Sequence, residues 1–219
     1  MARTISSFES GRSAIARLLC CSMVALLVAV LLPMPALAGQ TATEMVQRTI
    51  IDILYILAEL KDTSRSGQRQ WEIEQVVRRS FHYEDMAERA LGETANRSSP
   101  ADRRQYVRLF VQVLRDDLTD KLRDYAIAQV AYLSERSDAD GTQVMIAPAG
   151  SESDARIEFQ LVQRSGAWLV NDVSIDGASI VANYHLQFSR ILRDGSFSDL
   201  MEYMKHKALV ARVIEKVDS

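Results

Sequence analysis

The chain has 219 residues, of which 47% are hydrophobic and 25% are charged, a balance typical of a folded protein and not of a disordered one. Acidic residues outnumber basic ones by 29 to 26, which gives a formal net charge of −3. Because nucleic acids are bound through basic surfaces, this charge argues against a nucleic-acid partner. Nine glycines and four prolines are few, which favours helices over a many-turned all-β chain.

The N-terminal segment has the pattern of a secretory signal peptide. Three arginines precede an apolar run over residues 18–32, and the sequence Ala-Leu-Ala closes the segment at Ala38. An uncleaved membrane anchor is the alternative, but this run of 15 residues is shorter than the roughly 20 that span a bilayer. We therefore expect residues 1–38 to be cleaved and residues 39–219 to form a single exported domain, periplasmic in a Gram-negative cell. Cleavage would remove Cys20 and Cys21, which excludes disulfides and thiolate chemistry from that domain.

The first half of this domain has helical spacing. Apolar residues recur every three or four positions from Val46 to Leu57, which predicts a first helix. A polar link over residues 61–67 separates it from a second helix around residues 71–77. A short third helix over residues 83–91 should end at Gly92, and a long fourth helix should begin at a Ser99 cap and reach Tyr125.

After Tyr125 the period changes to two, which is typical of strands. Four short strands are predicted around residues 130–132, 144–146, 157–161 and 168–170, with polar turns at 134–141, 149–154 and 165–166. Because the links are short, we expect an antiparallel meander. The apolar parity changes after Val170, which predicts a bulge near Asn171 and Asp172, and Asp176-Gly177 should end the strand.

Helical spacing returns at Ile180 and continues to Gly195, and a Ser196–Asp199 cap opens a final helix. The predicted fold class is therefore α+β, with an antiparallel sheet of about four strands covered by about six helices.

Few residues suggest chemistry. The three histidines, at positions 82, 185 and 206, have no metal-ligand spacing, and no nucleophile elbow, phosphate loop or dinucleotide motif occurs. We therefore expect no catalytic residue, no metal site and no cofactor. One alternative is that Asp172 and Asp176 form a general acid and base pair, as in small isomerases of this architecture. The simpler interpretation is that each carboxylate bonds nearby backbone N–H groups at the bulge and the strand end.

The C-terminal half carries a family resemblance. The run from Trp168 to Val181 (WLVNDVSIDGASIV), with Tyr184 and Phe188 after it, resembles the signature of the MlaC/toluene-tolerance family. An earlier segment, residues 86–92 followed by Pro100, Arg103, Phe110 and Leu114, falls where that family has a second motif. The resemblance covers residues 44–210. It implies an NTF2-like half-barrel whose interior holds acyl chains, in a periplasmic phospholipid-binding component of an ABC transporter system.

The resemblance also implies a function. We expect a monomeric carrier, and not an enzyme, that exchanges phospholipid with an inner-membrane ABC transporter complex and an outer-membrane lipoprotein complex, and so maintains outer-membrane lipid asymmetry. The sequence departs from the family pattern at His82, Ala95, Leu118 and His185, and a hopanoid-type lipid, handled by one branch of the family, is the alternative cargo. Two alternative hypotheses are that the protein is a docking module of a transporter complex that binds no lipid, or that it is an NTF2-like enzyme.

The residues expected to line the acyl-chain cavity are apolar and lie on the fourth helix, the sheet and the helix that follows it. They are Phe110, Leu114, Leu118, Val144, Ile146, Phe159, Leu161, Trp168, Val170, Tyr184 and Phe188. For each of them, packing in a closed core is the alternative to ligand contact.

Overall fold

The computed structural model describes residues 40–123, 130–138, 141–148 and 156–217, without the side chains of residues 95–97, 148 and 211–217. Internal contacts divide the chain into two units, Met1–Gly39 and Gln40–Ser219, and the described residues all lie in the second. The predicted signal peptide over residues 1–38, the predicted turn at residues 149–154 and the helix end at Tyr125 lie outside the described residues.

The described residues form six α-helices, as predicted. These are α2 (Ala42–Glu59), α3 (Ser66–Ser80), α4 (Tyr83–Leu91), α5 (Pro100–Leu122), α6 (Ile180–Asp194) and α7 (Phe197–Val217), with 3-10 turns η1 (Thr63–Arg65) and η2 (Gly92–Arg97). Within this part of the chain, no helix combines the length and the apolar content needed to cross a bilayer.

Side-chain caps fix where these helices begin. The Ser99 hydroxyl accepts a hydrogen bond from the Asp102 N–H at 3.1 Å, and Ser196 and Asp199 cap each other reciprocally, which confirms both predicted starts. The α3 helix begins earlier than predicted, because the Asp62 carboxylate accepts from the Ser64 N–H at 2.8 Å. This cap winds the polar link into η1, which continues directly into α3.

The sheet is an open antiparallel meander in the order β1-β2-β3-β4-β5. Its strands are β1 (Val130–Asp138), β2 (Gly141–Pro148), β3 (Ile157–Arg164), β4 (Ala167–Ile175) and the two-residue β5 (Ala178–Ser179), one more than the four predicted. The predicted turn from Ser134 was wrong, because β1 continues to Asp138 in register with the start of β2. Its last six residues are exposed, so a polar edge strand gave no apolar alternation to detect.

The predicted bulge in β4 is confirmed. Gln160 pairs with Asp172 while Leu161 pairs with Val170, so that Asn171 is the extra residue. The bulge turns both Val170 and Val173 into the core, each with 0% of its surface exposed.

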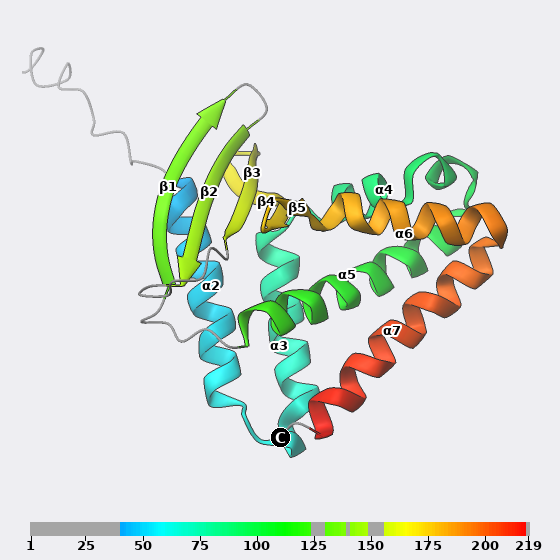
Figure 1. The fold of residues 1–219 in the computed structure, drawn as a ribbon, viewed down its shortest axis with the longest axis horizontal. Helices are drawn as coiled ribbons and strands as arrows, with labels where there is room; N and C mark the ends of the chain where they lie inside the picture. The colour runs from blue at the N-terminus through cyan, green and yellow to red at the C-terminus, as the bar shows by residue number, and fades with distance from the viewer. Residues whose placement is uncertain (1–39, 124–129, 139–140, 149–155, 218–219) are drawn as a thin grey trace, which may run out of the picture. The chain divides into compact units, whose positions relative to one another are not determined.

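One apolar core joins the sheet to the helices. Helix α2 lies against β1 and β2, and α3, α4 and α6 lie against β4, while α5 packs mainly on α7, α3 and α4 (Figure 1). Polar contacts fix β4 to the helices, since the His82 N–H donates to the Val170 carbonyl at 2.8 Å and the Arg89 guanidinium donates to the Asn171 carbonyl.

Candidate functional site

The structure brings most of the predicted lining residues into one core. Ten of the eleven are buried, with between 0% and 2% of their surface exposed, and Trp168 is half-buried at the edge of the same cluster. Burial alone is expected both of a packed core and of a ligand-lined interior. Their contact with an acyl chain therefore stays a prediction.

The faces that β2 and β3 turn inward are apolar. Val144 pairs with Phe159 and Ile146 with Ile157 across the two strands, and all four side chains are buried. Thr142 also lies on this face, and its hydroxyl is hydrogen-bonded within the sheet to Ser137 at 2.9 Å. Other protein atoms cover the side chains of the ten buried lining residues, and one of them, Tyr184, also lines a cavity described below.

Four aromatic rings join α5 to α6 inside this core. Tyr106 lies 6.1 Å from Phe110 and Phe110 lies 5.4 Å from Tyr184, between ring centroids. Tyr184 stacks on Phe188 at 5.5 Å, and Phe188 packs edge to face on Tyr106 at 6.1 Å. Each of the four rings therefore contacts two of the others, and we refer to them as the aromatic group. Tyr106 was missing from the predicted lining, although the four-residue spacing of 106 with 110 and of 184 with 188 could have indicated it.

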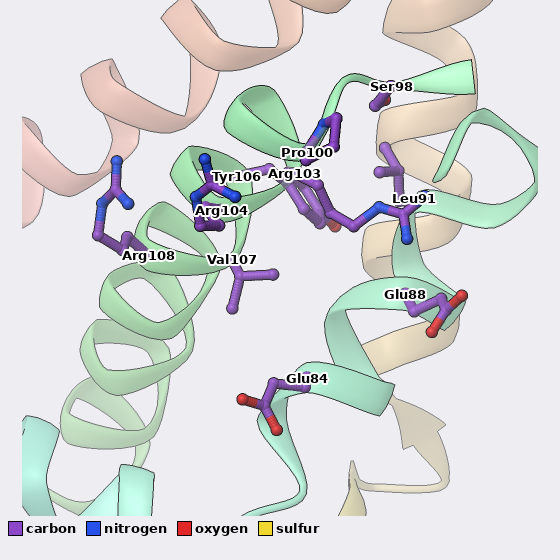
Figure 2. Close-up of a pocket in the computed structure, with 10 residues that line it drawn as sticks. All are labelled: Glu84, Glu88, Leu91, Ser98, Pro100, Arg103, Arg104, Tyr106, Val107 and Arg108. Carbon is purple, nitrogen blue, oxygen red and sulfur yellow. The ribbon is translucent and has the colours of Figure 1, made fainter. Parts of the chain in front are cut away.

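A cleft between α4 and α5 reaches this aromatic group at Tyr106 (Figure 2). Its volume is about 580 Å³, within the range of small-molecule sites. The buried Leu91 and Tyr106 and the half-buried Val107 lie at its base, and the Tyr106 hydroxyl donates to the Ala87 carbonyl at 2.9 Å. Burial raises the pKa of Tyr106 well above its ordinary range.

The side chains around this cleft are charged, and the charge differs between the two helices. Glu84 and Glu88 come from α4, whereas Arg103, Arg104 and Arg108 come from α5 (Figure 2). None of these charged residues was a predicted site residue, although Arg103 belongs to the segment that carries the family resemblance.

A second cavity, of about 490 Å³, reaches the aromatic group from Tyr184. The Tyr184 hydroxyl donates to the Asp117 carboxylate, which also accepts from the Lys207 ammonium at 3.0 Å. The Lys207 Nζ atom lies 5.1 Å from the centroid of the Tyr184 ring. Burial, followed by the charge of Asp117, raises the pKa of Tyr184. These contacts link α5, α6 and α7.

The two aspartates considered as an acid and base pair are both bonded to the backbone. The Asp172 carboxylate accepts from the Val173 N–H at 2.8 Å, from the Ser179 hydroxyl at 2.5 Å and from the Val181 N–H at 3.3 Å. The Asp176 carboxylate accepts from the Arg156 N–H at 3.0 Å. Asp172 thus joins the bulge to the first turn of α6, as the simpler interpretation expects.

Comparisons with known proteins agree with this fold. The family model described as "MlaC protein" matches residues 47–206, more than half of the chain. A search of the curated proteins found no match. Among solved structures, a phospholipid-binding protein from Ralstonia solanacearum, in complex with a phospholipid, matches with a TM-score of 0.61 and 18% identity. The alignment covers 80% of this chain and 99% of that one, which shows a shared fold.

Proposed function

The chain belongs to the MlaC family, and from this premise we propose that it is a periplasmic lipid carrier that shields acyl chains in its interior. It would exchange lipid with an inner-membrane ABC transporter complex and an outer-membrane lipoprotein complex, and so maintain outer-membrane lipid asymmetry. The observation that carries the proposal is the family match over residues 47–206. The fold shared with a protein solved in complex with a phospholipid supports it.

A carrier is needed because hydrocarbon is costly in water. At about 0.8 kcal/mol per CH₂, an acyl chain of about 16 carbons carries on the order of 12 kcal/mol against aqueous transfer. Binding such a cargo requires only a comparable apolar environment and no covalent step. The cleaved segment would be residues 1–38, and the exported domain would act as a monomer on phospholipid or, as the alternative, on a hopanoid-type lipid.

Burial of the lining residues is compatible with loading, because the surfaces that must separate are apolar. When the helices move away from Val144, Ile146 and Phe159, apolar contacts within the protein are exchanged for contacts with the acyl chain. No polar contact of these three side chains is broken. The free-energy gain is then mainly the removal of the lipid's own CH₂ groups from water.

Binding, and not catalysis, is the activity that we propose. The Asp172 and Asp176 carboxylates that a small isomerase would need are engaged with backbone N–H groups at 2.8 Å and 3.0 Å. These contacts give both residues a structural role without any reaction.

Photo-leucine, a nearly isosteric analogue that cross-links to its neighbours, tests the proposal. The full-length chain is expressed with this analogue, exported and processed by the cell, purified, irradiated and mapped by mass spectrometry. We expect lipid cross-links at the buried Leu114, Leu118 and Leu161. Three exposed leucines serve as matched internal controls: Leu133, Leu186 and Leu209, which are 52%, 59% and 56% exposed.

Two results would contradict the proposal. Protein purified without any bound lipid, and unable to take up lipid from vesicles, would show that it is not a carrier. Lipid attached only at the three exposed leucines would show that the acyl chains do not lie between the sheet and the helices.

A further inference from the structure

The cleft between α4 and α5 contains two pairs of like charges. Glu84 and Glu88 are four residues apart on α4, and Arg104 and Arg108 are four residues apart on α5. Side chains at this spacing lie one above the other on a helix, so like charges there repel and destabilise the helix. Two pairs of like charges that line one cleft each lower the stability of their helix, which suggests that they serve a function other than folding.

Elsewhere the chain uses the same spacing for attraction. Arg78 pairs with Glu74 at 2.7 Å, and Arg89 pairs with Asp85 at 2.8 Å on α4 itself. In contrast, the charged groups of Glu84, Glu88, Arg104 and Arg108 make no ion pair or hydrogen bond among the described residues. Two adjacent positive and two adjacent negative charges are therefore available to a ligand.

From this arrangement we propose that the cleft binds the headgroup of a zwitterionic amino-phospholipid, an inference that rests on the proposed carrier function. The phosphate, an anion, would lie between Arg104 and Arg108, which can each donate two hydrogen bonds to it. The ammonium group would lie against Glu84 and Glu88. A ligand that contains both charges relieves the repulsion in both helices.

The base of the cleft fits the remainder of such a lipid. Leu91, Val107 and the Tyr106 ring provide apolar surface for the glycerol and the first acyl carbons. Tyr106 also belongs to the aromatic group in the core, so a headgroup held here lies one side chain away from the proposed acyl-chain interior. The two glutamates would repel an anionic lipid that has no ammonium group, so the cleft would select zwitterionic over anionic phospholipids.

The test measures which lipids the protein takes up from vesicles, after the full chain has been expressed, exported and processed by the cell. Vesicles contain equal amounts of phosphatidylethanolamine, which is zwitterionic, and phosphatidylglycerol, which is anionic, and bound lipid is identified by native mass spectrometry. The variants are Glu84→Gln/Glu88→Gln and Arg104→Gln/Arg108→Gln. Arg190→Gln, an exposed arginine on α6, and Asp120→Asn, an exposed aspartate on α5, serve as matched controls. Because all these positions are exposed, thermal unfolding should stay close to that of the unchanged protein.

The unchanged protein should prefer phosphatidylethanolamine. The double glutamine variant on α4 should lose that preference by about five-fold, and the variant on α5 should bind both lipids less by a similar factor. The controls should keep the original profile. A parallel arm uses glycerophosphoethanolamine, the soluble headgroup without acyl chains.

Three results would overturn the inference in distinguishable ways. An unchanged protein that binds no lipid would remove the carrier function itself. Lipid uptake with the same class preference in all variants would leave the carrier function intact and exclude this headgroup site. Variants that weaken glycerophosphoethanolamine binding alone, without changing lipid uptake, would show that the cleft serves a soluble phosphate-and-amine compound and not the cargo lipid.

Discussion

Replacing Asp172 by alanine tests whether the family-like motif around β4 is structural. The carboxylate accepts three hydrogen bonds, at 2.8, 2.5 and 3.3 Å, that tie the Asn171 bulge to Ser179 and to the first turn of α6. Hydrogen bonds to charged groups contribute about 1.5–3 kcal/mol each, and loss of a helix cap costs about 1 kcal/mol. Since the site is half-buried and the third bond is long, we expect Asp172→Ala to lower the free energy of unfolding by about 3 kcal/mol.

The assay is equilibrium urea unfolding of lipid-stripped protein, followed by circular dichroism. Asp172→Asn keeps an acceptor oxygen and should lose about half as much, while retaining lipid uptake. Asp176→Asn, which alters one exposed contact to the Arg156 N–H, is the control and should stay within about 1 kcal/mol of the unchanged protein. An Asp172→Ala variant as stable as the original, or a folded Asp172→Asn variant that no longer binds lipid, would refute the structural role.

Three further predictions concern stability. Because burial raises the pKa of Tyr106 and Tyr184, both hydroxyls should stay protonated in the folded protein above the ordinary tyrosine pKa near 10. The stability that these two residues provide is complete below about pH 10 and is lost as the pH rises toward their folded-state pKa. An ultraviolet titration of the folded protein in which all seven tyrosines ionise together would contradict this. Gly92→Ala should lower the free energy of unfolding by about 1–3 kcal/mol, because φ is +65° and the new Cβ would lie 2.8 Å from His185 Cε1. Gly67→Ala is the control and should not destabilise the protein, since its Cβ would have no neighbouring atom within 4 Å. Equal melting temperatures of the two variants would exclude backbone strain at Gly92. Lys207→Ala should cost about 1 kcal/mol by removing the contacts to Asp117 and to the Tyr184 ring, and a double-mutant cycle with Asp117→Ala should show coupling between the two residues.

Local signals predicted much of the fold. The caps at Ser99 and Ser196, the Gly92 helix end and the Asn171 bulge each depend on a few neighbouring residues, so they could be read directly. The far end of β1 could not, because edge-strand residues with exposed side chains carry no alternation. The short β5 strand has only two residues and gives no periodic pattern.

The candidate site was harder to predict, for a physical reason. Periodicity reports that a side chain such as Phe159 is turned away from water, but not whether protein or ligand covers it. The charged cleft was missed because glutamates and arginines four residues apart on a helix look like an ordinary solvated face. Only the packing of α4 beside α5 brings Glu84 and Glu88 to one cleft with Arg104 and Arg108.

The burial of the predicted lining residues bears on how transport would be driven. A carrier whose apolar faces pack against each other after delivery can diffuse through an aqueous compartment without exposing those faces to other molecules or to its own copies. The protein itself then has a similar free energy with and without bound lipid. Such a shuttle would impose no direction by itself, so the net flow of lipid would be set by the membrane machinery at either end of the journey.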